Sequence, residues 1–245
     1  MGNLLKMERY QLSHNFFYWC GIIGIFLMGF LTADTYVSEV MGPSGGEAAS
    51  LADIFNGMVY DSTFLLIIIS GILSLILGQE FSHRTIDLEI SAGHSRKAIF
   101  ASKIITYLAA FHIMALIYPL AGCIREFFRF GMDDGGVIFY NVVKAVVYSC
   151  LLNSAVFLIA ILVCCCLRSS VKAVAVTVVV TFVLSLYLGY GMMLELPVDF
   201  LPIYQIRMAV STDAFFQLTA VLNGVVWGSL LIVPAWIKFH QCDLQ

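Results

Sequence analysis

Apolar residues fill six long stretches of the chain, and short polar segments separate them. Each stretch is continuous, without the period-two alternation of a half-buried strand, and is close to or longer than the roughly 20 residues that a helix needs to cross a bilayer. Because the backbone must satisfy its own hydrogen bonds in lipid, continuous runs favour helices over a β-barrel. The pattern predicts an all-α integral membrane protein, a single domain over residues 1–245, with transmembrane helices at 16–33, 58–77, 101–123, 137–167, 171–194 and 215–237.

Composition supports a membrane protein. Apolar residues make up 60% of the chain and charged residues only 12%, a balance that a soluble domain of 245 residues cannot bury. No small-residue cleavage site follows the first apolar run, so we expect that run to be a retained span and not a signal peptide.

Lysine and arginine are unevenly distributed between the polar segments, and this distribution predicts the orientation. With the N-terminus inside, nine of the 13 cations lie on the cytoplasmic side, and four lie outside, which favours cytoplasmic N- and C-termini. The predicted inner cations are Lys6, Arg9, Arg84, Arg96, Lys97, Lys103, Arg168, Lys172 and Lys238. The predicted outer cations are Arg125, Arg129, Lys144 and Arg207, and residues 34–57 form an outer loop that has none.

Two segments outside the six runs have an amphipathic character. Residues 1–15 mix leucines with Lys6, Glu8 and Arg9, which predicts a helix along the inner membrane surface; a frayed polar tail is the alternative. Between the fifth and sixth runs, Pro197 and Pro202 interrupt a partly apolar stretch. A re-entrant hairpin that dips into the outer leaflet is predicted there, and an ordinary outer loop is the alternative.

The polar segment after the second run, residues 78–100, is much longer than a simple link between two helices requires. Helical spacing relates four of its residues, which predicts a short amphipathic helix: Phe81, Thr85, Leu88 and Ala92. Gly93 can end this helix, and Ser95 can cap the next one. On physical grounds alone, a solvated loop whose charges keep it out of the membrane explains the segment equally well.

The same segment resembles the signature of the type 2 ATP-binding cassette (ABC) exporter permeases of bacteria. The resemblance rests on an acidic residue that closes the second span, a threonine that opens the cytoplasmic helix, and a Gly-x-x-Arg followed by Ser-Lys before the third span: Glu80, Thr85, Gly93, Arg96 and Lys103. Arg84 occupies the position where the family usually has glycine, a departure that affects the local turn.

The resemblance implies that residues 85–92 form a coupling helix that docks into a separate ATPase subunit. It implies that the coupling residues are Glu80, Arg84, Thr85, Ile86, Asp87, Leu88, Glu89, Gly93, Arg96, Lys97 and Lys103. It further implies two ATPase copies, a second permease chain as homo- or heterodimer, and a place in the bacterial plasma membrane. We expect lipid contacts and no nucleic-acid partner.

The chain lacks the residues of an ATPase. No G-x-x-x-x-G-K-[ST] sequence occurs, so we expect ATP and magnesium to be bound by the partner chain, and no catalytic or cofactor site here. Three consecutive helical residues cannot converge on one ion, so Cys164, Cys165 and Cys166 predict packing and not a metal site. His112, within the third run, is either a proton relay or, as we prefer, a hydrogen-bonded contact between helices.

The expected function is export of an amphipathic or hydrophobic substrate, in particular a toxin or antimicrobial peptide, which the resemblance implies. Export of a hydrophobic drug or lipid-like molecule is the alternative within the class. A membrane anchor without transport activity and an ion-driven secondary carrier are the alternatives outside it, although no chain of carboxylates through the membrane supports a carrier.

Overall fold

The computed structural model describes residues 2–38, 48–131, 135–212 and 214–241, and all regular secondary structure in this part of the chain is α-helical. The all-α prediction is confirmed. Six of the helices are long and apolar enough to cross a membrane, which confirms the predicted number of spans. The helices are α1 (Gly2–Ser13), α2 (Phe16–Ser38), α3 (Leu51–Tyr60), α4 (Thr63–Ser82), α5 (Thr85–Ser91), α6 (Arg96–Phe130), α7 (Gly135–Leu167), α8 (Ser170–Met193), α9 (Pro202–Ser211) and α10 (Leu218–His240).

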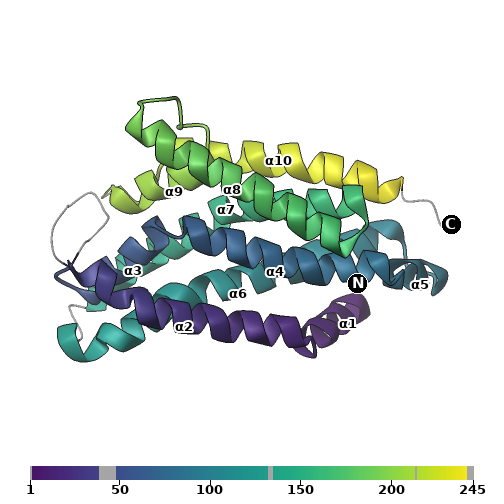
Figure 1. Cartoon of the computed structure of the whole chain (residues 1–245), viewed down its shortest axis with the longest axis horizontal. Coiled ribbons are helices and arrows are strands. Elements are labelled where there is room, and N and C mark those ends of the chain that lie inside the picture. Colours follow the sequence, from purple (N-terminus) through teal and green to yellow (C-terminus); the bar gives the residue numbers. More distant parts are fainter. Residues whose placement is uncertain (1, 39–47, 132–134, 213, 242–245) are drawn as a thin grey trace.

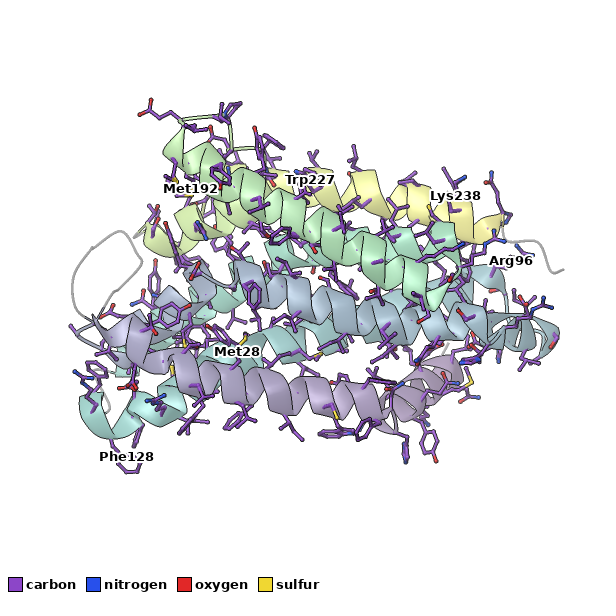
Figure 2. All side chains as sticks on the ribbon, viewed as in Figure 1. Met28, Arg96, Phe128, Met192, Trp227 and Lys238 are labelled. Atoms are coloured by element: carbon purple, nitrogen blue, oxygen red, sulfur yellow. The ribbon has the colours of Figure 1, made fainter. Side chains whose placement is uncertain are left out.

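The six long helices run side by side along the long axis of the molecule, and the short helices lie at its two ends (Figure 1). One end carries α1, α5 and the C-terminal end of α10, and the opposite end carries α3 and α9. The side chains of Arg96 and Lys238 lie at the first end, whereas Phe128 and Met192 lie toward the second (Figure 2). We call the end with α1, α5, Arg96 and Lys238 the basic end, because the predicted inner cations lie on the segments gathered there.

Three long helices form the centre of the bundle. More than half of the apolar window of α4, α6 and α7 is buried, against less than a third for α2, α8 and α10. The outer helices pack against the central ones in pairs, α8 on α4, α10 on α7 and α2 on α6. Consequently α2, α8 and α10 present most of the apolar surface that is free to contact lipid or another chain.

The end of α4 nearest α5 lies very close to the start of α8. A Cβ atom on Gly78 would lie 2.8 Å from the Cα atom of Ser170, so only glycine permits this approach. The backbone N–H of Ser170 donates to Ser82 Oγ at 3.1 Å, and Ser170 Oγ donates to the carbonyl of Leu75 at 3.3 Å. These contacts fix the end of α4 just before the chain turns into α5.

The second predicted run, 58–77, contains a helix break at Asp61 and Ser62, which separates α3 from α4. The predicted outer loop at 34–57 was wrong at both ends, because α2 continues to Ser38 and α3 begins at Leu51; residues 39–47 lie outside the described part of the chain. Ser50 caps α3 by accepting a hydrogen bond from the backbone N–H of Asp53, and apolar residues on α3 are buried against α6 and α7. The acidic residues of the segment suggested a loop, but packing against α6 and α7 stabilises its last part as the helix α3.

The segment between α8 and α10 contains a helix that starts at a proline. Pro202 occupies the first turn of α9, where its missing N–H costs no hydrogen bond. The side chains of Asn223 and Trp227, both on α10, donate to the carbonyl of Phe200 at 2.9 Å and 2.7 Å. The segment is thus anchored to α10, and its entry into the outer leaflet stays a prediction, as does the position of α1 along the inner surface.

The turn from α4 to α5 is tight and uses a left-handed residue. Arg84 has φ 56° and ψ 28°, directly after the C-cap residue His83, the position at which glycine is most favoured at helix ends. This explains why glycine suits the position in the family pattern, and it shows that arginine makes the same turn at a conformational cost. Gly93, at φ 88°, then ends the α5 segment, and Ser95 caps α6 by accepting from Ala98 N–H at 3.3 Å.

Replacing Arg84 should reveal the cost of the left-handed turn. Both Arg84→Gly and Arg84→Ala remove the side chain, but only glycine relieves the backbone, so Arg84→Gly should be more stable than Arg84→Ala by about 1 kcal/mol. Thermal unfolding of the purified variants in detergent should show this as a difference of about 2–4 °C. Equal midpoints would contradict the strained turn.

Candidate coupling site

A buried lysine near the start of α6 lies where four helices meet. The ammonium of Lys103 donates to three carboxylates, with Nζ 2.7 Å from Glu8 Oε1, 2.6 Å from Glu80 Oε2 and 3.1 Å from Glu89 Oε1. The hydroxyl of Tyr107, one turn further along α6, donates to Glu80 Oε1 at 2.6 Å. We call these five residues the Lys103 cluster. It ties α1, α4 and α5 to α6 through their side chains.

The Lys103 cluster is almost closed to solvent. The exposed fraction is 4% for Lys103, 1% for Glu8 and 6% for Glu89. Removing an ion from water costs several kcal/mol, so such groups are stable only beside close partners of opposite charge. One ammonium faces three carboxylates, which leaves an excess of negative charge when all of them are ionised. The cluster therefore favours a protonated state of one of its acids.

Burial shifts the acids of the cluster that lie outside the spans. Burial raises the pKa of Glu8 to about 7, because the attraction of Lys103 only partly offsets desolvation and the neighbouring carboxylates add to it. The pKa of Glu89 is also raised by burial, against the same attraction of Lys103. Its Oε2 atom is buried and has no hydrogen-bond partner among the described residues. These acids lose their protons less readily than exposed glutamates do.

Helix α5 has one face in the cluster and one face in solvent. Ile86 and Glu89 are buried toward α4 and α6, while Leu88 is 67% exposed. A large apolar side chain with this exposure, on a helix of only seven residues, is unusual unless another surface covers it. The helix is held in place from behind, since the hydroxyl of Thr85 donates to the carbonyl of Glu80 at 2.9 Å.

The predicted coupling residues fall into three groups by their exposure. Four point inward and are buried or nearly so: Glu80, Ile86, Glu89 and Lys103. Four are exposed: Arg84, Leu88, Gly93 and Lys97. Three are half-buried: Thr85, Asp87 and Arg96. Glu80 and Lys103 are two of the residues on which the resemblance to the exporter permeases rests. They contact each other and not an outside surface.

The coupling segment also contacts the last helix. The guanidinium of Arg96 donates to the carbonyl of His240, at the end of α10. Nearby, the ring of Phe239 lies 5.2 Å from that of Phe100 and 6.3 Å from that of Phe81. The end of α10 is thus joined to both helices that flank α5.

A second polar network lies at the opposite end of α4. Arg207 on α9 contacts Asp61, with Nη2 and Oδ1 3.2 Å apart, and donates to Thr63 Oγ1 at 3.2 Å. The other carboxylate oxygen of Asp61 accepts from the hydroxyl of Tyr36 at 3.4 Å. Burial raises the pKa of Asp61, and the charge of Arg207 opposes that rise. Helix α4 is therefore tied by ion pairs at both ends.

Sequence reasoning missed Glu8, Tyr107, Asp61 and Arg207 as members of these networks. Glu8 was assigned to a surface helix and Arg207 only to the outer set of cations. A usable signal existed for Glu8, because Leu4, Glu8 and Leu12 are spaced for one helix face, and all three are buried. For Asp61 the signal was an acid inside an otherwise apolar run.

One polar contact inside the spans joins two helices. His112 Nε2 lies 2.8 Å from Ser154 Oγ, the interhelical hydrogen bond that we preferred to a proton relay. Cys164 and Cys165 are buried and Cys166 is exposed, so the three side chains do not share one environment. Within the described residues, no group of three or more histidine, cysteine or acidic side chains could hold a metal ion.

Neutralising the central cation should destabilise the protein strongly. Lys103→Met would leave three buried carboxylates without their counter-ion, a loss of about 3–5 kcal/mol in the free energy of unfolding. The matched variant Lys97→Met, at an exposed site six residues away, should change it by no more than about 0.5 kcal/mol. Thermal unfolding in detergent measures both, and equal effects would contradict a structural role for the cluster.

Stability should also depend on pH through Glu8. Its pKa is near 4.5 in the unfolded chain and about 7 in the folded protein, so the folded state binds more protons between these values. The free energy of unfolding should therefore fall as pH rises through this window and level off above it. Glu8→Gln should reduce the slope, and Glu89 should account for a remainder of the same sign. An unchanged slope in Glu8→Gln would refute this assignment.

Comparison with known proteins agrees with this architecture. The model of the family described as ABC-2 family transporter protein matches residues 4–185, roughly three quarters of the chain, including α1, α4, α5 and α6. A search of curated proteins finds no match to the chain. The six apolar helices and this match over most of the sequence identify the chain as a member of the ABC-2 transporter family, a multi-pass membrane permease subunit that works with an ABC ATPase.

Proposed function

We propose that the chain is the permease of an ATP-driven exporter in the bacterial plasma membrane, and that α5 is the surface which its ATPase partner contacts. The observation that carries this proposal is the division of α5 into an exposed apolar face at Leu88 and a charged face locked to Lys103. A partner that covers Leu88 gains apolar burial. Any displacement of α5 would then change the contact between Glu89 and Lys103 directly.

The Lys103 cluster supplies the path by which movement of α5 reaches the membrane helices. Glu89 lies on α5, and the ammonium that it binds also holds Glu80 on α4 and Glu8 on α1. A shift of α5 must move these helices with it or break buried ion pairs, and the latter is costly. We propose that two ATPase copies bind ATP and magnesium and that their closure shifts α4 and α6 as rigid bodies.

A second permease chain, identical or related, would complete the exporter. The support is the low burial of α2, α8 and α10, which leaves long apolar helix faces without a partner in one chain. In this arrangement the transport path lies between two copies. The basic end, with α1 and α5, faces the cytoplasm, in agreement with the excess of cations predicted there.

An apolar groove supports a hydrophobic or amphipathic cargo. It lies between α2 and α4, has a volume of about 380 Å³, and no charged residue lines it. Small residues open it on the α2 side, namely Cys20, Gly21 and Gly24, and Met28, Ile68 and Ile72 line its walls. Apolar side chains of an amphipathic peptide, such as a toxin or an antimicrobial peptide, suit these walls better than a sugar or an ion does. We propose that class of cargo.

The exposed leucine of α5 provides the direct test. In cells that also produce the candidate ATPase, Leu88→Asp should abolish co-purification of the two proteins and the rise in ATPase activity that the pair shows. The matched variant Leu194→Asp changes a leucine of nearly equal exposure, 66% against 67%, at the opposite end of the bundle. That variant should keep both the association and the activity.

Two outcomes would overturn the proposal. One is an ATPase that still associates with the permease when residues 85–92 are scrambled in a chain that remains folded. The other is transport by the purified permease in vesicles without any ATPase, driven by an ion gradient, which would make the protein a carrier.

A further inference from the structure

A second groove lies at the inner end of the bundle, where α1 leans on α6. Its volume is about 360 Å³, and α1, the start of α2 and the middle of α6 form its walls. Apolar side chains line most of it: Leu5, Leu12, Tyr18, Ile105, Ala109 and Ile113. Ile105 and Ile113 are about half exposed, so the groove opens sideways toward the surroundings of the helices. In a membrane, those surroundings are lipid chains.

The groove has a cation at its rim. Arg9 lines it and is exposed, and none of the ion pairs among the described residues includes Arg9. Lys6 lies one helical turn before Arg9 and is also exposed, so both cations share one side of α1. No acidic residue lines the groove.

The nearest acid in the sequence does not neutralise this cation. The carboxylate of Glu8 is buried on the neighbouring face of α1, about 100° around the helix from Arg9, where its Oε1 atom lies 2.7 Å from Lys103 Nζ. Helix α1 therefore has a charged face that is satisfied inside the protein and a second face that combines an unpaired guanidinium with an apolar groove. This second face is complementary to a molecule with one anionic group and one long apolar chain.

We propose that the α1–α6 groove binds an anionic phospholipid of the inner leaflet, with an acyl chain between α1 and α6 and the phosphate on Arg9. Guanidinium is the side-chain group that best matches phosphate, because its N–H donors can bind two oxygens at once. Cations of a surface helix attract anionic headgroups by about 1 kcal/mol each, and Lys6 adds to the field at the same rim.

The bound lipid would hold α1 from the side that the Lys103 cluster does not reach. Glu8 fixes one face of α1 to α6 by an ion pair, and the acyl chain fills the space between the same two helices along the adjacent face. This role needs no ATPase and no cargo, so it stands apart from the proposed transport function. A lipid that binds only when α1 is packed against α6 stabilises this packed arrangement by mass action.

Native mass spectrometry of the purified permease tests the proposal. The protein is freed of co-purified lipid and then mixed with phosphatidylglycerol or phosphatidylcholine of identical chain length. The wild type should retain phosphatidylglycerol in preference to phosphatidylcholine. Arg9→Gln should lower this preference about fivefold, the effect expected for one interfacial cation. Arg9→Lys should keep part of it, because the charge remains while the paired donors are lost.

Two further variants separate the groove from the headgroup contact. Ala109→Phe fills the groove and should reduce retention of both lipids, since each needs room for its chain. Lys172→Gln removes an exposed cation at the start of α8, on the same predicted side of the membrane, and should leave the lipid preference unchanged. Size-exclusion profiles and thermal unfolding identify variants that have lost the fold; the smaller change Ala109→Val then replaces Ala109→Phe.

The proposal fails under either of two results. Equal retention of the two lipids by the wild type would show that the rim does not recognise the anionic headgroup. A full preference for phosphatidylglycerol in Arg9→Gln, with the fold intact, would place the headgroup elsewhere on the protein.

Discussion

The architecture at the basic end of this permease depends on one buried lysine. Lys103 faces carboxylates from three other helices. Its ammonium is too deeply buried for water to replace a carboxylate as its partner. Hydrophobic packing tolerates small sliding movements between helices, but short buried ion pairs do not. The cluster therefore joins the neighbouring ends of α1, α4, α5 and α6, although α5 itself contributes only seven residues.

Helix α4 extends this constraint across the bundle. At its C-terminal end Glu80 is held by Lys103 and Tyr107, and just before its N-terminal end Asp61 is held by Arg207 of α9. Between the two ends, α4 packs closely along α8, with Gly78 allowing near contact of the backbones. Helix α4 thus connects the contacts of α5 with those of α9.

The sequence was sufficient to predict the long helices, but it did not predict which helices and side chains contact one another. Continuous apolar runs predicted six spans, because crossing a bilayer leaves few alternatives for the backbone. The helix at α5 followed from spacing, since Leu88 and its neighbours share a periodic pattern. The break at Asp61 and the helix α3 escaped prediction, because both depend on contacts with α6, α7 and α9 that are distant in sequence. The inward direction of Glu89 and Lys103 also escaped it, because a charged residue in a polar segment is expected to face water.

The Lys103 cluster also limits how this protein can change over evolutionary time. Replacing Lys103 leaves three carboxylates without their counter-ion among apolar side chains, whereas replacing one of the glutamates still leaves the ammonium with two carboxylates. Loss of the lysine is therefore tolerated only after acids of the cluster have been lost, whereas an acid can be lost while the lysine remains. The exposed residues of α5 carry no such mutual dependence, which leaves that face free to diverge along with whichever protein covers it.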